Sequence, residues 1–320
     1  MSVALSRKLA ASICVALMLG AAIHASPVAA DSFDYQLVPR KIADDTWLLV
    51  GKTEDFSRSN GGNIVNTAFV VTDDGVVVID SGPSKRYAEQ MRRAIARITP
   101  KPVIRVFNTH HHPDHFLGNQ VFADVPTLAL AETIAGQRSE GGAFADNVYR
   151  LSGDWIKGTE AVAAREAVAP GAIVIGGHPF ELIALAGHTQ GDLVILDRRT
   201  GVLFAGDLVF HNRAPTTPHA SIVQWLAALH RLDAIPFKIM VPGHGEPVGD
   251  GRAVEQTRRY LRWVESTLAL GAARGDEMTE ILGKALPAEF ATLPLGAEEF
   301  ARSVAHLYRR YEAGTLTRQR

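Results

Sequence analysis

Four side chains that can bind metal ions fall within six residues, in the spacing His-x-His-x-Asp-His. Side chains two residues apart on an extended chain point the same way, so His110 and His112 can bind one cation. After the bend at Pro113, Asp114 and His115 can bind a second cation. Imidazole nitrogens and carboxylate oxygens suit zinc, and a catalytic zinc site keeps one coordination position open. This stretch therefore predicts a two-metal site.

Three more candidate ligands follow along the chain, each next to a glycine: His188, Asp207 and His244. We expect each of them at the end of a strand, because glycine lets the backbone bend sharply into a crowded site. His111 lies between two candidate ligands and is expected to point away from the metal.

Two adjacent divalent cations indicate hydrolytic chemistry. They lower the pKa of a bridging water from about 15.7 toward neutrality, and the resulting hydroxide can attack a carbonyl group. Asp114 is the residue expected to orient that nucleophile. Cys14 is the only cysteine, so a chain that begins after it has no cysteine nucleophile, cysteine ligand or disulfide.

The elements that must position these residues alternate between strands and helices. The cluster directly follows a predicted strand, Val103 to Phe107, and loops at the carboxyl ends of strands carry the sites of α/β folds. Helical spacing predicts helices over Lys85 to Ile98 and Ser221 to Leu232. The polar segment from Glu132 to Arg165 is interpreted as a helical insertion or lid. Further strands are predicted over 35–38, 46–50, 63–71, 76–80, 127–130, 173–175, 180–186, 193–196, 202–205 and 239–241.

Two hairpin-like regions, each followed by a helix, fit an αββα sandwich, although periodicity alone does not separate this from other α/β layer folds. From Ala253 to Tyr311 the pattern is helical, with breaks at Pro287 and Pro294. We expect residues 31–252 to form the sandwich and residues 253–320 a helical segment packed on it.

The N-terminus resembles a secretory signal peptide. Arg7 and Lys8 precede an apolar stretch from Leu9 to Ile23, and Val28-Ala29-Ala30 offers a cleavage site after Ala30. Residues 1–30 are therefore predicted to direct the protein to the periplasm, with an uncleaved membrane anchor as the alternative. The formal net charge is −1, so nothing favours a nucleic acid partner, and a small-molecule substrate is expected.

The ordered set of motifs resembles the signature of the metallo-β-lactamase superfamily. The motifs are His110-x-His112-x-Asp114-His115, Gly187-His188-Thr189, Gly206-Asp207 and Pro242-Gly243-His244-Gly245, and the resemblance covers roughly residues 35–248. It implies an αββα sandwich with extra C-terminal helices and two zinc ions. It assigns His110, His112 and His188 to the first ion, Asp114, His115 and His244 to the second, and Asp207 to both. Iron and manganese remain alternatives, although some iron-binding members carry Glu in place of His112.

Within that superfamily, the segments 60–67 and 107–119 most resemble exported SoxH-like proteins, also called quinoprotein relay system zinc metallohydrolases. This resemblance implies hydrolysis of an ester, thioester, lactone or amide-type substrate, and association with a periplasmic quinoprotein dehydrogenase. Two alternatives stay open: a zinc β-lactamase, and a metal-binding accessory module without turnover. Five residues are predicted to contact substrate: Phe56, Asn63, Asn119, His211 and Arg213. The oligomeric state is left open.

Overall fold

The computed structural model describes residues 33–318. The predicted signal peptide, its cleavage point after Ala30 and Cys14 lie outside the described residues. From Phe33 onward the chain clusters as one compact unit. None of the helices between residues 33 and 318 is long and apolar enough to cross a lipid bilayer.

The first sheet has seven strands in sequential order, antiparallel from β1 to β4 and parallel from β4 to β7. The loop that follows β5, within the parallel half, leads into the predicted metal ligands. The strands are β1 Arg40–Ala43, β2 Thr46–Leu49, β3 Thr67–Val71, β4 Val76–Ile79, β5 Val103–Phe107, β6 Thr127–Ala129 and β7 Glu166–Ala167.

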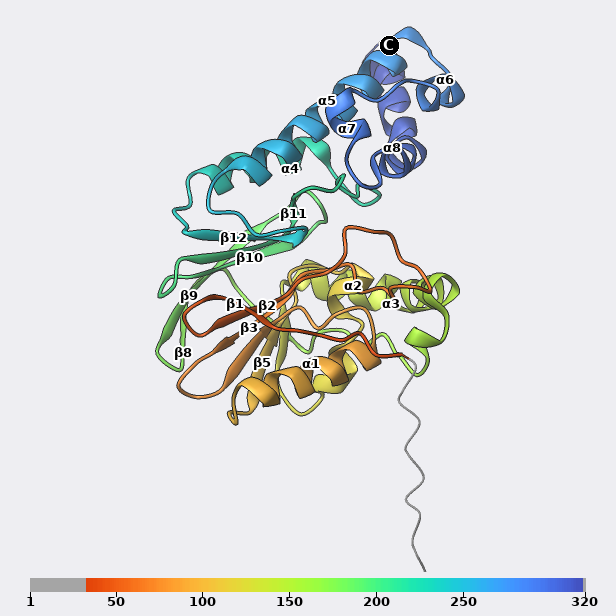
Figure 1. Ribbon diagram of the computed structural model, residues 1–320. Coiled ribbons are helices and arrows are strands. Elements are labelled where there is room, and N and C mark those ends of the chain that lie inside the picture. Colours follow the sequence, from red (N-terminus) through yellow and green to blue (C-terminus); the bar gives the residue numbers. More distant parts are fainter. Residues whose placement is uncertain (1–32, 319–320) are drawn as a thin grey trace, which may run out of the picture. The chain divides into compact units, whose positions relative to one another are not determined.

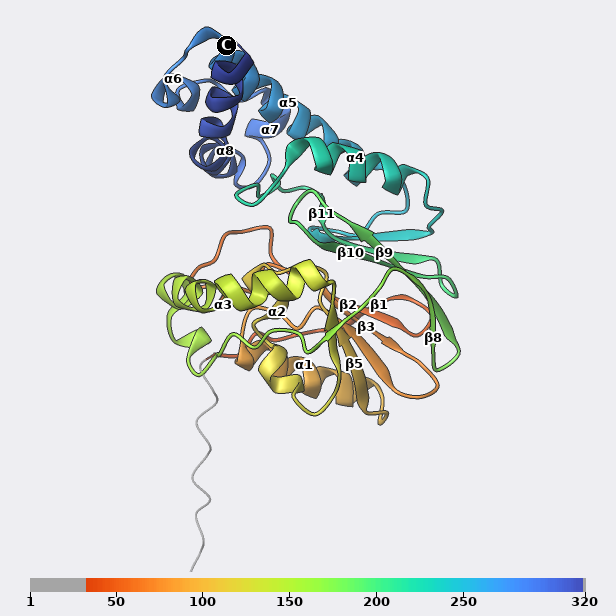
Figure 2. The ribbon, with the colours of Figure 1, turned by 180° about the vertical axis from the view of Figure 1, so that it is seen from behind.

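The second sheet has five strands in the order β12-β11-β10-β9-β8, with only the β11–β12 pair parallel. These strands are β8 Gly171–Ile175, β9 His178–Leu185, β10 Asp192–Asp197, β11 Val202–Phe210 and β12 Ile239–His244. The two sheets face each other, and Figures 1 and 2 show helices covering both outer faces.

Helix α1 lies on the outer face of the first sheet, and α4 and α5 lie on the outer face of the second (Figure 1). Helix α3 lies beside α2, at the end of the first sheet that carries the predicted ligands. The helices are α1 Lys85–Ile98, α2 Pro113–Phe116, α3 Ala131–Ser152, α4 Ile222–Asp233, α5 Arg252–Arg274, α6 Met278–Leu282, α7 Ala288–Ala291 and α8 Gly296–Arg318. The described residues also include two short 3₁₀ helices, η1 Asn119–Phe122 and η2 Gly153–Ile156.

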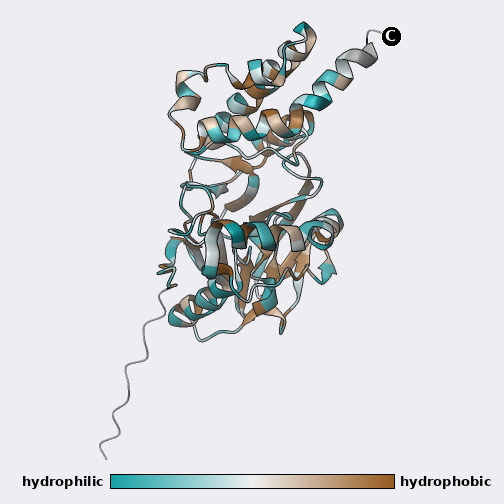
Figure 3. Ribbon diagram, turned by 90° about the vertical axis from the view of Figure 1, so that its right-hand side faces the viewer, coloured by the Kyte–Doolittle hydropathy of each residue, from teal (hydrophilic) through white to brown (hydrophobic). Residues whose placement is uncertain are grey.

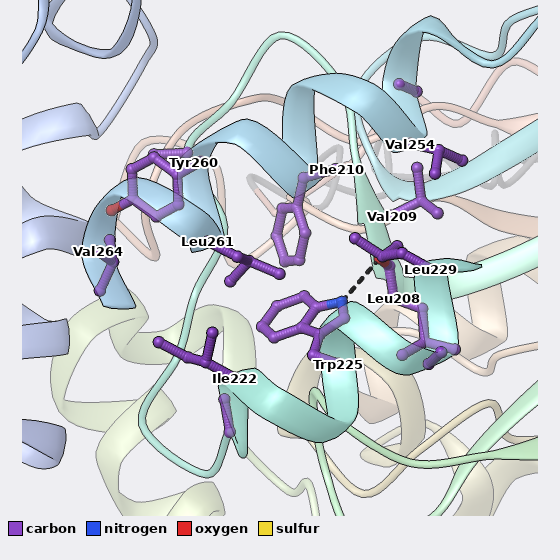
Figure 4. Packing of buried hydrophobic residues seen from close by; sticks show 14 of the residues in the cluster. Leu208, Val209, Phe210, Ile222, Trp225, Leu229, Val254, Tyr260, Leu261 and Val264 are labelled. Atoms are coloured by element: carbon purple, nitrogen blue, oxygen red, sulfur yellow. Dashed lines mark hydrogen bonds between the residues drawn. The ribbon is translucent and has the colours of Figure 1, made fainter. Parts of the chain in front are cut away.

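The core forms three apolar layers, as expected for helices packed on both sides of two facing sheets. One layer lies between α1 and the first sheet, one lies between the sheets, and one lies between the second sheet and α4, α5 and α8. In Figure 3 the strands are mostly brown and hydrophobic, while the helices alternate in colour as amphipathic helices do. Figure 4 shows the third layer around Trp225, whose indole Nε1 donates to the carbonyl of Leu208 at 2.9 Å.

The αββα sandwich with extra C-terminal helices is confirmed, and so are the helix at Lys85–Ile98 and the strand at Val103–Phe107. The predicted strand over 35–38 is wrong. Tyr35 and Leu37 are buried, which mimics strand alternation. However, the Tyr35 backbone N–H donates to the Gln90 side chain on α1, so this segment is bonded to α1 and not to a neighbouring strand. The first strand begins at Arg40.

Other boundaries also differ from the sequence prediction. The strand predicted over 63–71 begins only at Thr67, because the chain before it turns so that the Asn66 amide can donate to Pro242 and Gly245. The segment 132–165 is largely helical, as predicted: it holds almost all of α3, then η2 and a connection to β7. The C-terminal helices also break at Gly275, whose φ of 74° gives α5 a left-handed cap.

Candidate metal centre

The seven predicted ligands gather in one buried cluster between the two sheets. The β5–α2 connection supplies His110 and His112, α2 supplies Asp114 and His115, and the other three come from the second sheet and the turn after β9. His188 follows β9 and His244 ends β12, as predicted for strand ends. Asp207 does not end a strand: β11 runs on to Phe210, and its pairing with β12 is irregular around Gly206, where φ is 53°. This irregularity re-aims the chain in the middle of the strand.

The first group consists of His110, His112, His188 and Asp207, whose ligand atoms all lie within 4.8 Å of one another. His188 Nε2 is 2.8 Å from His112 Nδ1 and 3.4 Å from Asp207 Oδ2. His110 Nε2 is 3.9 Å from Asp207 Oδ2. Ligands of a tetrahedral zinc ion lie roughly 3.4 Å apart, since each is about 2.1 Å from the metal. The group can therefore close around one cation.

The second group consists of Asp114, His115 and His244. His244 Nε2 and His115 Nε2 lie 3.3 and 3.7 Å from Asp114 Oδ2. Asp207 reaches this group as well, because its Oδ2 is 3.2 Å from His244 Nε2 and its Oδ1 is 3.2 Å from His115 Nε2. The Asp207 carboxylate thus lies between the two groups, where it can contact a cation in either.

Several polar atoms that face this cluster are buried without a hydrogen-bond partner: His110 Nε2, His115 Nε2 and Asp207 Oδ1. Buried polar atoms are normally paired, so such a concentration needs an explanation. A donor set of imidazole nitrogens and carboxylate oxygens fits zinc. The residues present therefore fit a pair of divalent cations.

Hydrogen bonds behind the cluster orient the imidazole rings. Asp80 accepts from His115 Nδ1 and from the hydroxyl and backbone N–H of Thr109, each at 2.8 Å. His244 Nδ1 donates to the carbonyl of Ile64 at 2.7 Å. Such outer bonds fix the tautomer, so that the Nε2 atoms of His115 and His244 present lone pairs to the cluster.

Burial lowers the pKa of three ligand histidines, whereas nearby carboxylates raise the pKa of a fourth. Burial lowers the pKa of His110 and His112 well below the ordinary value, and lowers that of His188 to about 3. For His115 burial acts in the same direction, but the carboxylates of Asp80, Asp207 and Asp114 outweigh it and raise the pKa. At neutral pH the first-group rings are therefore neutral and free to bind a cation.

Glycines beside the ligands leave no room for a side chain. A Cβ on Gly243 would lie 1.8 Å from Asp207 Oδ1. A Cβ on Gly187, whose φ is 155°, would lie 2.3 Å from the Cα of Trp225 in α4. The sequence pattern of a glycine before each of these ligands is thus explained by close approach of the backbone.

A cavity of about 340 Å³ opens onto the cluster. Phe56, Ile64 and Phe144 make its wall partly apolar. Arg213 also lies on the wall, held by Glu299 of α8 at 3.3 Å in a buried ion pair, so the C-terminal helices help to shape the cavity. The lining residues are Asp55, Phe56, Ile64, His112, Pro113, Asp114, Phe144, Asn147, Arg150, Leu151, Asp207, Arg213, Thr216, Pro218, His219, His244 and Arg302.

Of the five predicted substrate contacts, Phe56 and Arg213 lie on the cavity wall and three do not. Asn119 is buried, and its amide bonds to Asn108 and the carbonyl of Val162 behind the ligand loop. His211 Nδ1 contacts the carbonyl of Glu246 at 2.7 Å. Asn63 is also absent from the wall. Their positions do not support direct contact with substrate, and Asn119 instead supports the ligand loop.

Sequence reasoning missed a set of residues next to the first group. His111 does point away from the two ligand groups, but toward Glu140 on α3, with 3.3 Å between Nε2 and Oε1. His219 contacts both Glu140 and His112. No local motif marks Glu140, because its place depends on how α3 packs against a loop about eighty residues further along the chain.

Comparison with known proteins agrees with this fold and site. Residues 60–244 match the model of the Metallo-beta-lactamase superfamily, so the chain belongs to that superfamily. The helices α5 to α8 lie beyond the matched residues. The solved metallo-beta-lactamase from Pontibacter korlensis is 25% identical, with a TM-score of 0.57, over 71% of this chain and 99% of that chain.

Two relatives illustrate the range of named activities. Metallo-beta-lactamase IND-1 of Chryseobacterium indologenes is 28% identical over 207 residues, which is 61% of this chain and 77% of that protein. A hydroxyacylglutathione hydrolase of Erythrobacter litoralis is 28% identical over 163 residues, which is 51% of this chain and 55% of that protein. The superfamily relatives are hydrolases, and this chain carries a His/Asp cluster able to bind metal.

Proposed function

We propose that the protein is an exported dinuclear zinc hydrolase that acts on an ester, thioester, lactone or amide-type substrate. The observation that carries this proposal is the buried convergence of seven imidazole and carboxylate side chains, several with unpartnered atoms, at the base of a cavity. In the proposal His110, His112 and His188 hold one ion, Asp114, His115 and His244 hold the other, and Asp207 contacts both.

Bound zinc would supply Lewis-acid chemistry, lowering the pKa of water and polarising a carbonyl oxygen. Asp114 lies on the cavity wall as well as in the second group. Its carboxylate can therefore orient a water molecule that faces the substrate and accept the proton that it loses. Phe56, Ile64 and Phe144 exclude bulk water from that side of the cavity.

The arginines of the cavity suggest that the substrate carries a negative charge. Arg213 is paired with Glu299, and Arg302 is paired with Asp55 and Glu299. Arg150 instead donates to the neutral amide of Asn147 at 2.6 Å. Its charge is thus available to a carboxylate on the substrate.

A β-lactamase activity is the second candidate, favoured by the similarity to IND-1. Against it stands Asp207. The cysteine-bearing type of zinc β-lactamase needs cysteine near this position, and the cysteine-free type does not rely on a bridging aspartate. Hydroxyacylglutathione hydrolases, by contrast, share the Asp207 pattern, which favours a thioester or related substrate.

We further propose that the protein is exported and that it associates with a quinoprotein dehydrogenase. Export rests on the basic, apolar and small-residue pattern of residues 1–30. Association with a periplasmic quinoprotein dehydrogenase rests on the resemblance of segments 60–67 and 107–119 to SoxH-like proteins. Without turnover, the same resemblance would favour an accessory module.

The test is metal content and activity measured on one purified sample of the chain processed from Asp31. Zinc, iron and manganese are quantified per chain, and a thioester, a lactone and a chromogenic β-lactam are assayed with and without chelator. We expect close to two zinc ions per chain and chelator-sensitive thioester or lactone hydrolysis. Asp114→Asn should lower kcat by about 10²- to 10⁴-fold, the usual contribution of a general base.

Other outcomes would redirect the proposal. Fast β-lactam hydrolysis would promote the second candidate. Two bound ions without turnover on any substrate, together with tight binding to a quinoprotein dehydrogenase, would indicate the accessory module. Folded protein without bound metal would refute the dinuclear site.

A further inference from the structure

A chain of close polar contacts leads from the first ligand group to helix α3. His112 Nε2 lies 2.8 Å from His219 Nδ1. His219 Nε2 lies 3.0 Å from Glu140 Oε2, and His111 Nε2 lies 3.3 Å from the other oxygen of the same carboxylate. These residues come from the ligand loop, from the segment after β11 and from α3, so the contacts join three separate parts of the chain.

The two nitrogens of His112 have different partners, which assigns its tautomer. Nδ1 faces the first group, 2.8 Å from His188 Nε2. When Nδ1 is committed to a cation, the proton resides on Nε2, which then donates to His219 Nδ1. His219 consequently carries its proton on Nε2 and donates to Glu140. Each imidazole of the chain then donates through one nitrogen, and the Glu140 carboxylate, which can only accept, lies at its end.

We propose that Glu140 and His219 are positioning residues that orient His112 for cation binding. They also hold the face of α3 that lines the cavity at a fixed position relative to the metal centre. This inference rests on the proposed metal-binding function, because it concerns the ion that His112 holds. It adds a second means of orientation to the site: His115 is held directly by the buried Asp80, whereas His112 is held by a carboxylate acting through another imidazole.

The face of α3 that carries Glu140 also forms part of the cavity wall. Phe144, Asn147 and Leu151 line the cavity and follow Glu140 at intervals of four, seven and eleven residues, which places them on one side of the helix. One turn before Glu140, a Cβ on Gly136 would lie 2.6 Å from His111 Cγ, so α3 approaches the loop closely. Because Glu140 is held in place, the part of the cavity wall that a substrate would contact is also held at a fixed position relative to the cation.

A third cation held by His111, His112 and His219 is the competing explanation, because these residues also form a compact group. The geometry favours the hydrogen-bond chain. Nδ1 of His112 already faces the first group, so a third cation on Nε2 would require His112 to lose its remaining ring proton and bind two ions at once. A neutral imidazole has one acceptor nitrogen and one N–H donor, which fits a donated hydrogen bond to His219 Nδ1 at 2.8 Å.

The experiment measures zinc affinity by competition with a chromophoric chelator, and the absorption spectrum after loading with Co²⁺, on the full chain. The variants are Glu140→Gln, His219→Asn and the double variant, with Ser139→Ala as the control. Ser139 is the exposed neighbour of Glu140 and bonds only locally, to the carbonyl of Gly136. Circular dichroism of each metal-free variant verifies folding.

We expect Glu140→Gln to raise the dissociation constant of one of two zinc ions about 10-fold, the lower end of the range for outer-shell partners, since Glu140 is half exposed. His219→Asn should have at least that effect, and the double variant should match His219→Asn alone, because Glu140 acts through His219. The Co²⁺ spectrum should change in these variants. Ser139→Ala should match the wild type.

Three results would overturn the inference. Wild-type protein with two ions, and unchanged affinity and spectra in both variants, would refute the positioning role and leave the proposed function intact. Three ions in the wild type, with the third lost in His219→Asn, would establish the third-cation explanation. A folded wild type that binds no zinc would refute the inference and the proposed function together.

Discussion

Asp80 connects the first sheet to the metal centre through hydrogen bonds. It follows β4, is almost fully buried, and accepts bonds from His115 and twice from Thr109. Its φ of 59° lies in the left-handed region, which Asp and Asn adopt more readily than other residues with a side chain. The backbone conformation and the three bonds together aim the carboxylate at the ring of His115.

Asp80→Asn should weaken binding of the second cation selectively. Asparagine keeps the size and tolerates the positive φ, but it replaces one acceptor oxygen with a donor. A donor facing His115 Nδ1 or Thr109 disturbs the ring orientation, so we expect a 10- to 100-fold loss of affinity for one of two ions. Metal retained per chain after dialysis against graded chelator measures it. Asp74→Asn, at an exposed position of the β3–β4 hairpin, is the control, and equal retention in both variants would contradict the role of Asp80.

At the residue scale, sequence alone predicts side chains whose chemistry and spacing are local. His110, His112, Asp114 and His115 fall within one short run, so their spacing is visible directly. Glu140 is different, because it acts through His219, which contacts a histidine 107 positions away in the chain. Only the packing of α3 against the ligand loop brings those groups together.

At the scale of elements, sharp turns next to packed helices position the ligands from the second sheet. Gly187 lies between β9 and His188, with its Cα facing the backbone of Trp225. Trp225 is fully buried in the layer between α4 and β11 (Figure 4). Helix α4 therefore cannot retreat from a larger residue without losing its packing on the sheet.

Gly187→Ala should destabilise the protein by about 1–3 kcal/mol, the usual cost of forcing extra carbon into a packed region, and should also reduce metal content by displacing His188. Urea unfolding and metal analysis provide the measurements. Gly142→Ala is the matched control: nothing lies within 4 Å of its added Cβ, and alanine in a helix interior stabilises by roughly 0.5–1 kcal/mol relative to glycine. Similar unfolding midpoints for the two variants would show that the close approach at Gly187 is not important.

The bounds of a helix or strand are predicted correctly from the sequence where a single packing contact produces the spacing of its apolar residues. The apolar spacing of α1 comes only from its packing on the first sheet, and the bounds Lys85–Ile98 agree with the prediction. The failures have other causes. Tyr35 and Leu37 alternate in burial without pairing as a strand, and β11 continues past Ala205 because the irregularity at Gly206 lets the strand bend without ending.

At the scale of the whole molecule, the candidate ligands connect the two halves of the sandwich. Four of them follow β5 of the first sheet, one follows β9 of the second sheet, and two lie in β11 and β12. A bound cation would stabilise the folded state by mass action, because the unfolded chain does not assemble the site. Metal-free protein instead holds a cluster of buried histidines, whose protonation becomes the main electrostatic cost of acidification.

Metal-free protein should therefore lose stability as the pH falls from about 6.5 to about 4. In that window His110, His112, His188 and His111 remain neutral in the folded state, because burial lowers their pKa, to about 3 for His188 and about 4 for His111. In the unfolded chain they bind protons near pH 6.5. Burial of Asp192 acts oppositely, raising its pKa to about 7, so the folded state holds one proton that the unfolded chain has released.

Counted over these five groups, the unfolded state binds about three more protons than the folded state in this window, so their contribution to the free energy of unfolding falls as the pH falls. His115, whose pKa is raised, is protonated in both states well below pH 6.5 and adds to the balance only near and above that value, where its stabilisation is lost as pH rises. The measurement is urea unfolding of chelator-treated protein at pH 7 and pH 5. We expect a lower midpoint at pH 5 and a smaller pH effect in His188→Gln. A midpoint that is unchanged or higher at pH 5 would mean that these histidines bind protons in the folded state, and that the cluster is open to water when no cation is bound.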